Sequence, residues 1–137
     1  MTDFSQRKNT STVQNRVAGV SLASLIVDPS LLPSFPAAGD TIGFFDLPPG
    51  ARIVDAWIKL NQSVGAATST LKLQAVPSGG GAVDLTATLA ATAAGGNRTN
   101  TVPPDKQTVV TTIQALVGTA NLNAAGNIEV GVLYSQA

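Results

Sequence analysis

The sequence GDTIGFFDLPPGARIVDAWIKL, residues 39–60, carries the clearest secondary-structure pattern in the chain. Its first part alternates as a strand does, with Ile42 and Phe44 on one face and Phe45 on the other. The Pro-Pro-Gly sequence at residues 48–50 then interrupts any ladder, because proline has no N–H group to donate and glycine permits positive φ. The segment therefore predicts two strands joined by a proline-glycine corner.

The second of these strands, residues 53–61, alternates between apolar and polar residues. The predicted buried face holds Val54, Ala56, Ile58 and Leu60, and the polar face holds Asp55, Lys59 and Asn61. Trp57 and Ile53 fall on the polar side. Exposed tryptophan is a frequent interface anchor, so Ile53 and Trp57 are candidate interface residues. The alternative is that a slip of one residue in register buries Trp57 as a core filler.

Short alternating runs recur along the rest of the chain and predict an all-β protein. Strands are expected within residues 16–27, 69–76, 83–89, 108–117 and 128–134. A short helix over residues 22–27 and a helical reading of residues 89–94 remain as alternatives. Seven or eight short strands separated by turn signals are typical of an antiparallel β-sandwich, and a jelly-roll-like arrangement of two four-stranded sheets fits the count.

The chain divides into a polar arm, residues 1–14, and a single sandwich domain, residues 15–137. The arm is expected to be extended and flexible, because it has too few apolar residues to offset the entropy of ordering. It is either a frayed terminus or a segment that orders against a partner. Residues 28–38 contain three prolines and form a stiff connector, which Leu31, Leu32 and Phe35 are expected to hold against the body. Residues 95–105 are expected to be an exposed polar loop.

Charge and composition narrow the classes of function. The chain has 8 basic and 8 acidic residues, so its formal net charge is zero. We therefore expect neither nucleic acid nor membrane as a partner, since both attract concentrated basic patches. Charged residues make up 12% of the chain, about half the usual quarter. A weakly charged surface favours self-association, although a sparsely charged monomer is the alternative. The N-terminal segment has no apolar core typical of a signal peptide, so synthesis in the cytoplasm is expected.

Residues that carry catalysis or bind metal are scarce. The chain has no histidine and no cysteine, which removes the usual general base, the common nucleophile pairs and the commonest metal ligands. The carboxylates are scattered, and only Asp46 and Asp55 flank the same predicted corner. We expect no enzymatic activity, no metal and no cofactor.

The central segment resembles small virion proteins of tailed bacteriophages. The resemblance lies in the pattern GDxIxxxxLPPGARIVD, residues 39–55, and in GxIxVxVxY, residues 126–134. It extends over roughly residues 39–74 together with the last strand. A LPxGARxxD corner followed by a strand is a structural pattern, so it identifies a fold more than an activity.

The resemblance implies a capsid cement or decoration protein that binds the major capsid protein on the outside of the virion, as a homotrimer. Arg7 and Lys8 in the arm would then contact acidic residues of the shell. One alternative is another virion subunit, such as a head fibre base, a tail protein or an adaptor. A second alternative, from a different class, is a β-sandwich carbohydrate-binding module; such modules usually present several exposed aromatic residues, and Trp57 and Tyr134 are the only candidates here besides phenylalanine.

Overall fold

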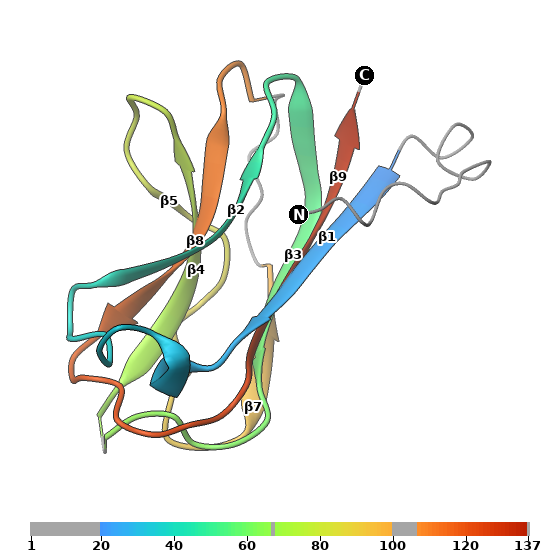
Figure 1. Cartoon of the computed structure of the whole chain (residues 1–137). Helices are drawn as coiled ribbons and strands as arrows, with labels where there is room; N and C mark the ends of the chain where they lie inside the picture. The colour runs from blue at the N-terminus through green and yellow to red at the C-terminus, as the bar shows by residue number, and fades with distance from the viewer. Residues whose placement is uncertain (1–19, 67, 100–106, 137) are drawn as a thin grey trace.

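The computed structural model describes residues 20–66, 68–99 and 107–136. Two antiparallel sheets pack face to face, which confirms the predicted all-β sandwich (Figure 1). The strands are β1 (Val20–Val27), β2 (Thr41–Leu47), β3 (Ala51–Leu60), β4 (Thr70–Pro77), β5 (Val83–Asp84), β6 (Leu89–Ala90), β7 (Gly95–Arg98), β8 (Thr111–Gly118) and β9 (Ile128–Gln136). A 3₁₀ turn, η2 (Pro29–Leu31), follows β1. Among the described residues, no helix is long and apolar enough to span a membrane.

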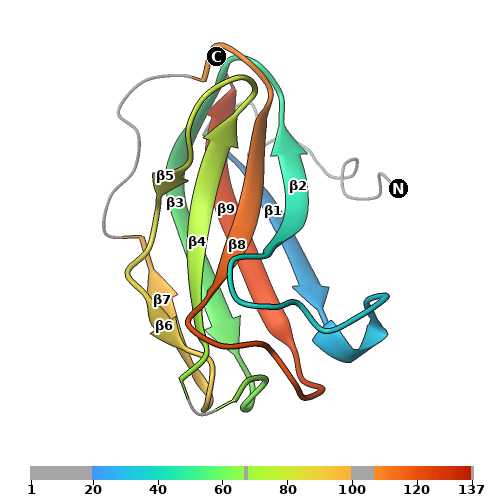
Figure 2. The ribbon, with the colours of Figure 1, turned by 90° about the vertical axis from the view of Figure 1, so that its left-hand side faces the viewer.

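The strand order is that of a jelly roll. Sheet A has the order β1-β9-β3-β7, and sheet B has the order β2-β8-β4-β5, with β6 also paired to β4. Because β5 and β6 together occupy one strand position, each sheet contains four positions, and consecutive strands alternate between the sheets except at β4 and β5, which are neighbours in sheet B. Figure 2 shows sheet B in front of sheet A. The predicted jelly-roll-like arrangement is therefore confirmed.

The core lies between the two sheets and is built from alternate residues of the central strands. In β4, β8 and β9 the apolar residues that the alternation places inward are buried, apart from half-buried Tyr134, while Gln74 and Gly131 on the outer faces are buried as well. The largest fully buried side chains are Leu47, Ile53, Ile58, Leu60, Leu71, Leu73, Leu85, Ile113, Leu122 and Ile128. Burying side chains of this size stabilises a domain by about 1.5–3 kcal/mol each.

A β-bulge in β3 reverses the predicted faces at the start of that strand. The register against β9 shifts between Ile53 and Asp55, so Val54 is an extra residue. Ile53 is consequently buried, with 2% of its surface exposed, whereas Val54 is 47% exposed. The predicted outward position of Ile53 and the predicted inward position of Val54 are both wrong. Beyond the bulge, Ala56, Ile58 and Leu60 are buried as predicted.

A second bulge lies in β2, where the register against β8 shifts between Gly43 and Phe45. Phe44 is buried, and Phe45, predicted on the opposite face, also packs against the core. The two rings meet edge to face, with centroids 6.4 Å apart. The bulge therefore allows two successive aromatic residues to contribute to the same core.

The segment between β5 and β6 departs from the single strand predicted for residues 83–89. Strand pairing covers only its two ends, and Thr86 between them is buried. The backbone N–H of Leu73 donates to Oγ1 of Thr86 at 3.1 Å, in place of a backbone acceptor. Thr86 also forms an isolated antiparallel bridge with Thr99, next to β7 of the other sheet. This interruption links the two sheets along one side of the sandwich.

The N-terminal part of the domain is a strand, so the alternative of a short helix at residues 22–27 is wrong. In the connector that follows, Leu32 packs against the core as predicted. Leu31 is 82% exposed and does not hold the connector to the body. Instead, Asp28 caps the 3₁₀ turn by accepting a hydrogen bond from the N–H of Ser30 at 2.9 Å. The hydrogen bond from the Ser30 hydroxyl, followed by that from the Ser30 N–H, lowers the pKa of Asp28.

Candidate interface on the outer face of sheet A

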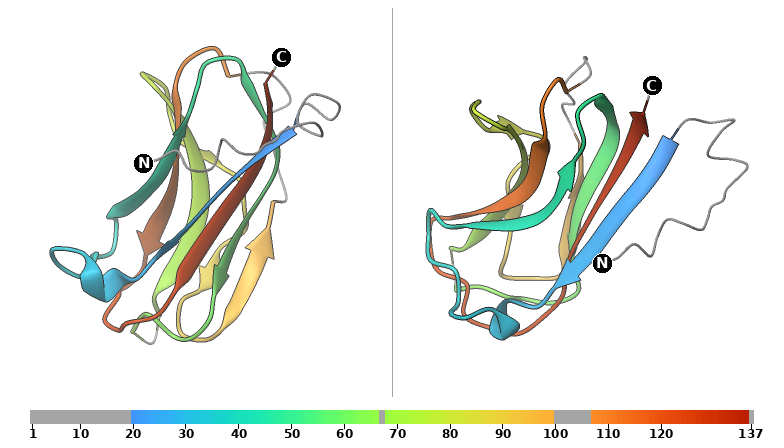
Figure 3. Two further views of the ribbon diagram at one scale, coloured as in Figure 1. Left: turned by 45° about the vertical axis from the view of Figure 1, so that its right-hand side comes forward. Right: turned by 45° about the horizontal axis from the view of Figure 1, so that its top comes forward.

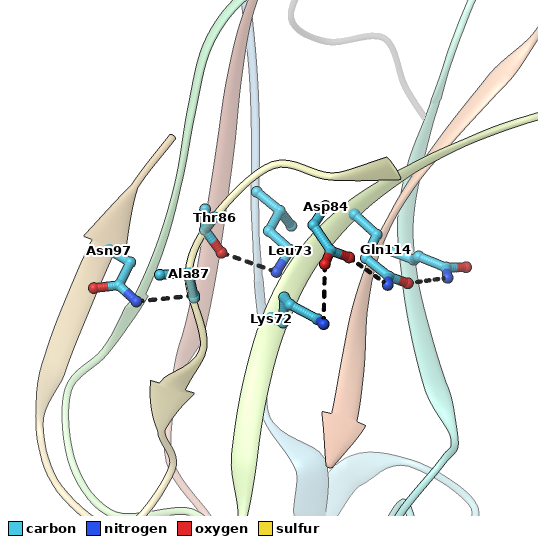
Figure 4. A network of polar contacts seen from close by, with 8 residues as sticks. Lys72, Leu73, Asp84, Thr86, Ala87, Asn97 and Gln114 are labelled. Carbon is cyan, nitrogen blue, oxygen red and sulfur yellow. Dashed lines mark hydrogen bonds and ion pairs between the residues drawn. The ribbon is translucent and has the colours of Figure 1, made fainter. Parts of the chain in front are cut away.

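The outer face of sheet B carries a polar ladder whose groups satisfy one another. Lys72 pairs with Asp84 at 3.1 Å, and Nε2 of Gln74 donates to Oδ1 of Asp84 at 2.9 Å. Nε2 of Gln114 in turn donates to Oε1 of Gln74 at 3.0 Å. Figure 4 shows how this ladder crosses from β5 over β4 to β8. The hydrogen bond from Gln74 and the contact with Lys72 lower the pKa of Asp84. The polar groups on this face therefore have partners within the sheet, as is typical of a surface that faces water.

The outer face of sheet A has a different character. Figure 3 (left) shows its strands side by side, with β1 at one edge and β7 at the other. The register places Leu22 opposite Leu133 and Ile26 opposite Glu129. Leu22 and Ile26 are each 56% exposed, and Leu133 is half-buried. Exposed apolar side chains gathered on one face are typical of a surface that binds a partner.

Trp57 completes this apolar region. It lies opposite Gly131, which in turn lies opposite Ser24. A Cβ atom on Gly131 would overlap the ring carbons Cζ2, Cη2 and Cε2 of Trp57 at nearly equal distances. Near-equal distances to three neighbouring carbons place that position beneath the face of the ring, not at its edge. The indole therefore lies flat on β9, half-buried, with its other face directed away from the sheet.

We define the apolar face as Leu22 and Ile26 of β1, Leu133 of β9 and Trp57 of β3. Of the predicted interface residues, Trp57 belongs to it. Ile53 does not, because it points into the core. Arg7 and Lys8 lie outside the described residues. The sequence pattern did not identify Leu22 and Ile26 as interface residues, although the uncharged run VSLASLIV at residues 20–27 is a signal for them.

Charged residues border the apolar face on the side of β7. Nη2 of Arg98 donates to Oδ2 of Asp55 at 2.6 Å, and the Thr99 hydroxyl donates to Oδ1 of the same carboxylate at 2.6 Å. The hydrogen bond from Thr99, followed by that from Arg98, lowers the pKa of Asp55. An apolar centre with a charged border is the usual anatomy of a protein interface.

A groove of about 840 Å³ runs along this charged border. Trp57, Lys59 and Glu129 line it together with Gly95 and Gly96 of β7. Gly96 adds no side chain above β3, where a Cβ would lie 3.0 Å from the carbonyl oxygen of Ile58. The predicted polar loop at residues 95–105 thus begins as an edge strand, and residues 100–106 lie outside the described part of the chain.

The possible carboxylate pair is not assembled. Asp55 belongs to the outer face of sheet A, whereas Asp46 lies in β2 of sheet B and accepts a hydrogen bond from the Thr112 hydroxyl at 2.7 Å. The two residues therefore sit on opposite outer faces of the sandwich. Across residues 20–66, 68–99 and 107–136, no three His, Cys, Asp or Glu side chains gather as metal ligands would.

No protein-family model matches the sequence, and no curated protein matches it either. Two solved structures contain chains of similar fold. A chain in the capsid of Ralstonia phage GP4 is 21% identical, with a TM-score of 0.66, over 86% of this chain and 84% of that one. A chain in the capsid asymmetric unit of cyanophage Pam1 is 16% identical, with a TM-score of 0.56, over 86% and 85%. At these identities the likeness establishes the fold.

Proposed function

We propose that this chain is a structural subunit of a bacteriophage virion, and that it binds the outside of the capsid lattice as a cement or decoration protein. The observation that carries the proposal is the apolar face of sheet A, on a sandwich whose other outer face is a satisfied polar ladder. The likeness to chains in two phage capsids supports the same reading, because it extends over most of both partners.

Binding would rest on apolar contact. The apolar face would lie against the major capsid protein, and the charged border around Asp55 and Arg98 would surround that contact. A single copy offers only the four side chains of the apolar face to this contact. Three copies in one trimer, as the resemblance implies, would raise the effective affinity by holding several contacts at once. Arg7 and Lys8 of the N-terminal arm remain proposed contacts to acidic residues of the shell.

Co-sedimentation with the shells of the encoding phage tests this proposal. We expect the wild-type chain to sediment with the shells, and Ile26→Lys to lose at least about tenfold in affinity, because a charge would be buried against apolar surface. The matched control is Val83→Lys, since Val83 is an exposed valine on β5 of sheet B. If both variants bound the shells equally well, the apolar face would not be the surface that binds the capsid. A wild-type chain that stays in the supernatant would contradict the proposal itself.

The groove beside Trp57 favours a second candidate function, carbohydrate binding. An aromatic ring with one free face, flanked by Lys59 and Glu129, could stack against a sugar and hydrogen-bond its hydroxyl groups. A glycan array separates the two candidates. Hits that quench the fluorescence of Trp57, the single tryptophan of the chain, would favour the carbohydrate-binding module. An array without hits would contradict carbohydrate binding and leave capsid binding as the remaining candidate.

A further inference from the structure

The four edges of the sandwich are not alike. At the edges of sheet B, β5 has only two residues, and β2 carries a bulge and the charged Asp46. At the far edge of sheet A, β7 has four residues, two of them glycine. Short strands, bulges and charges are the devices by which proteins prevent a sheet edge from pairing with another chain. Three of the four edges therefore carry such protection.

Strand β1 carries none of these devices. It has eight residues, without a charge or a proline, and its register with β9 is unbroken from Val20 to Val27. Within the described residues, β9 is the only strand that pairs with it. Leu22, Leu25 and Ile26 are all exposed along it. A long, regular and apolar edge of this kind is a template for a further strand.

The sequence of β1 is also complementary to itself. Antiparallel pairing of two copies about Ser24 places Leu22 of each copy opposite Ile26 of the other, on the outer face. On the inner face, the same register places Ala23 opposite Leu25. Four pairs around the axis thus match apolar with apolar, whereas Ser24 meets Ser24 and Ser21 meets Val27, and no like charges meet. A two-fold contact requires a surface that complements itself in this way.

We propose that β1 pairs antiparallel with β1 of a second copy of this chain, about a two-fold axis at Ser24. The pairing would extend sheet A continuously through both copies and join their two apolar faces into one. This pairing adds a contact between copies to the proposed function, and the role of that contact in the capsid rests on the proposed function. Because the contact uses one sheet edge, it leaves other surfaces for a three-fold contact, and trimers joined across two-fold axes would form a connected layer.

The absence of cysteine from the chain allows a clean test by disulfide trapping. In the proposed register, the two Ser24 residues lie directly opposite one another, with Cα atoms about 4.5–5.5 Å apart, which suits a disulfide. The matched control is Leu22→Cys, on the same face of the same strand. The two residues at position 22, one from each copy, would be four residues or about 13 Å apart along the strands, which a disulfide cannot span.

Under mild oxidation, we expect Ser24→Cys to form a covalent dimer at least about tenfold faster than Leu22→Cys, because pairing raises the local thiol concentration. Equal rates, or faster trapping of Leu22→Cys, would overturn the proposed pairing. A Ser24→Cys variant that stays unlinked would do so too.

A second variant tests the pairing without a new covalent bond. Ser24→Lys would place two ammonium groups side by side at the axis, and we expect light scattering to show weaker self-association than for the wild type. The matched control is Gln114→Lys, on the outer face of sheet B. Unchanged association of Ser24→Lys would contradict the pairing. Since this experiment contains no shells, its failure is distinct from a failure of capsid binding.

Discussion

The contact between Trp57 and Gly131 shows how one residue without a side chain fixes a surface feature. A glycine in the interior of a strand normally weakens it, because it adds no side chain to the packing. Here the indole ring of Trp57 covers the glycine and supplies that packing from the neighbouring strand. The same contact holds the ring flat, which sets the shape of the apolar face.

Replacing Gly131 with alanine should therefore displace the indole ring. We expect Gly131→Ala to destabilise the fold by about 1–3 kcal/mol, as overpacking does, and to shift tryptophan emission to longer wavelength as the ring becomes more exposed. Chemical denaturation followed by fluorescence measures both effects on the single tryptophan.

Gly43→Ala is the matched control for that substitution. Gly43 also lies in a strand, on the outer face of sheet B, and no atom lies within 4 Å of the position its Cβ would take. We expect wild-type emission from this variant. An unchanged emission spectrum for Gly131→Ala would show that the ring does not rest on the glycine.

At the scale of the strand, alternation predicted most faces correctly and failed at the bulges. Leu71 and Leu73 of β4, and Ile128 and Val130 of β9, are buried as their period of two indicates. Val54 adds one residue to β3, and this reverses the faces on one side of it. The bulge is set by pairing with β9, a strand distant in sequence, so the local pattern around residue 54 contains no sign of it.

The interruption between β5 and β6 depends on a side chain that replaces a backbone acceptor. Thr86 accepts from the buried N–H of Leu73, and loss of the hydroxyl would leave that donor without a partner. We expect Thr86→Val to lower the free energy of unfolding by about 1–3 kcal/mol, measured in urea.

Thr88→Val controls for the loss of a threonine hydroxyl in the same segment. Thr88 is exposed, and its contact with Asn97 uses the backbone carbonyl, which the substitution keeps. A change within about 0.5 kcal/mol is expected for such a surface position. If the two variants were equally stable, the hydrogen bond to Thr86 would not contribute to the fold.

At the scale of the whole molecule, the sequence predicted the sandwich more fully than the interface. Turn signals and alternation are local, and they suffice to count strands and to suggest a jelly roll. An interface depends on which residues remain exposed after packing. Leu22 and Ile26 look like core residues in the sequence, and only their place on the outer face of an edge strand distinguishes them. Trp57 could be identified because it interrupts a polar face.

If this chain coats a capsid as proposed, the capsid lattice sets its copy number in purified virions. Quantitative mass spectrometry against the major capsid protein would give the ratio of the two chains. A subunit that repeats with the lattice should be present in on the order of hundreds of copies per particle, in a fixed ratio set by the symmetry of the shell. A few copies, or a few tens, would instead indicate a fibre base, tail or adaptor protein, and absence from the virion would contradict the proposed structural role.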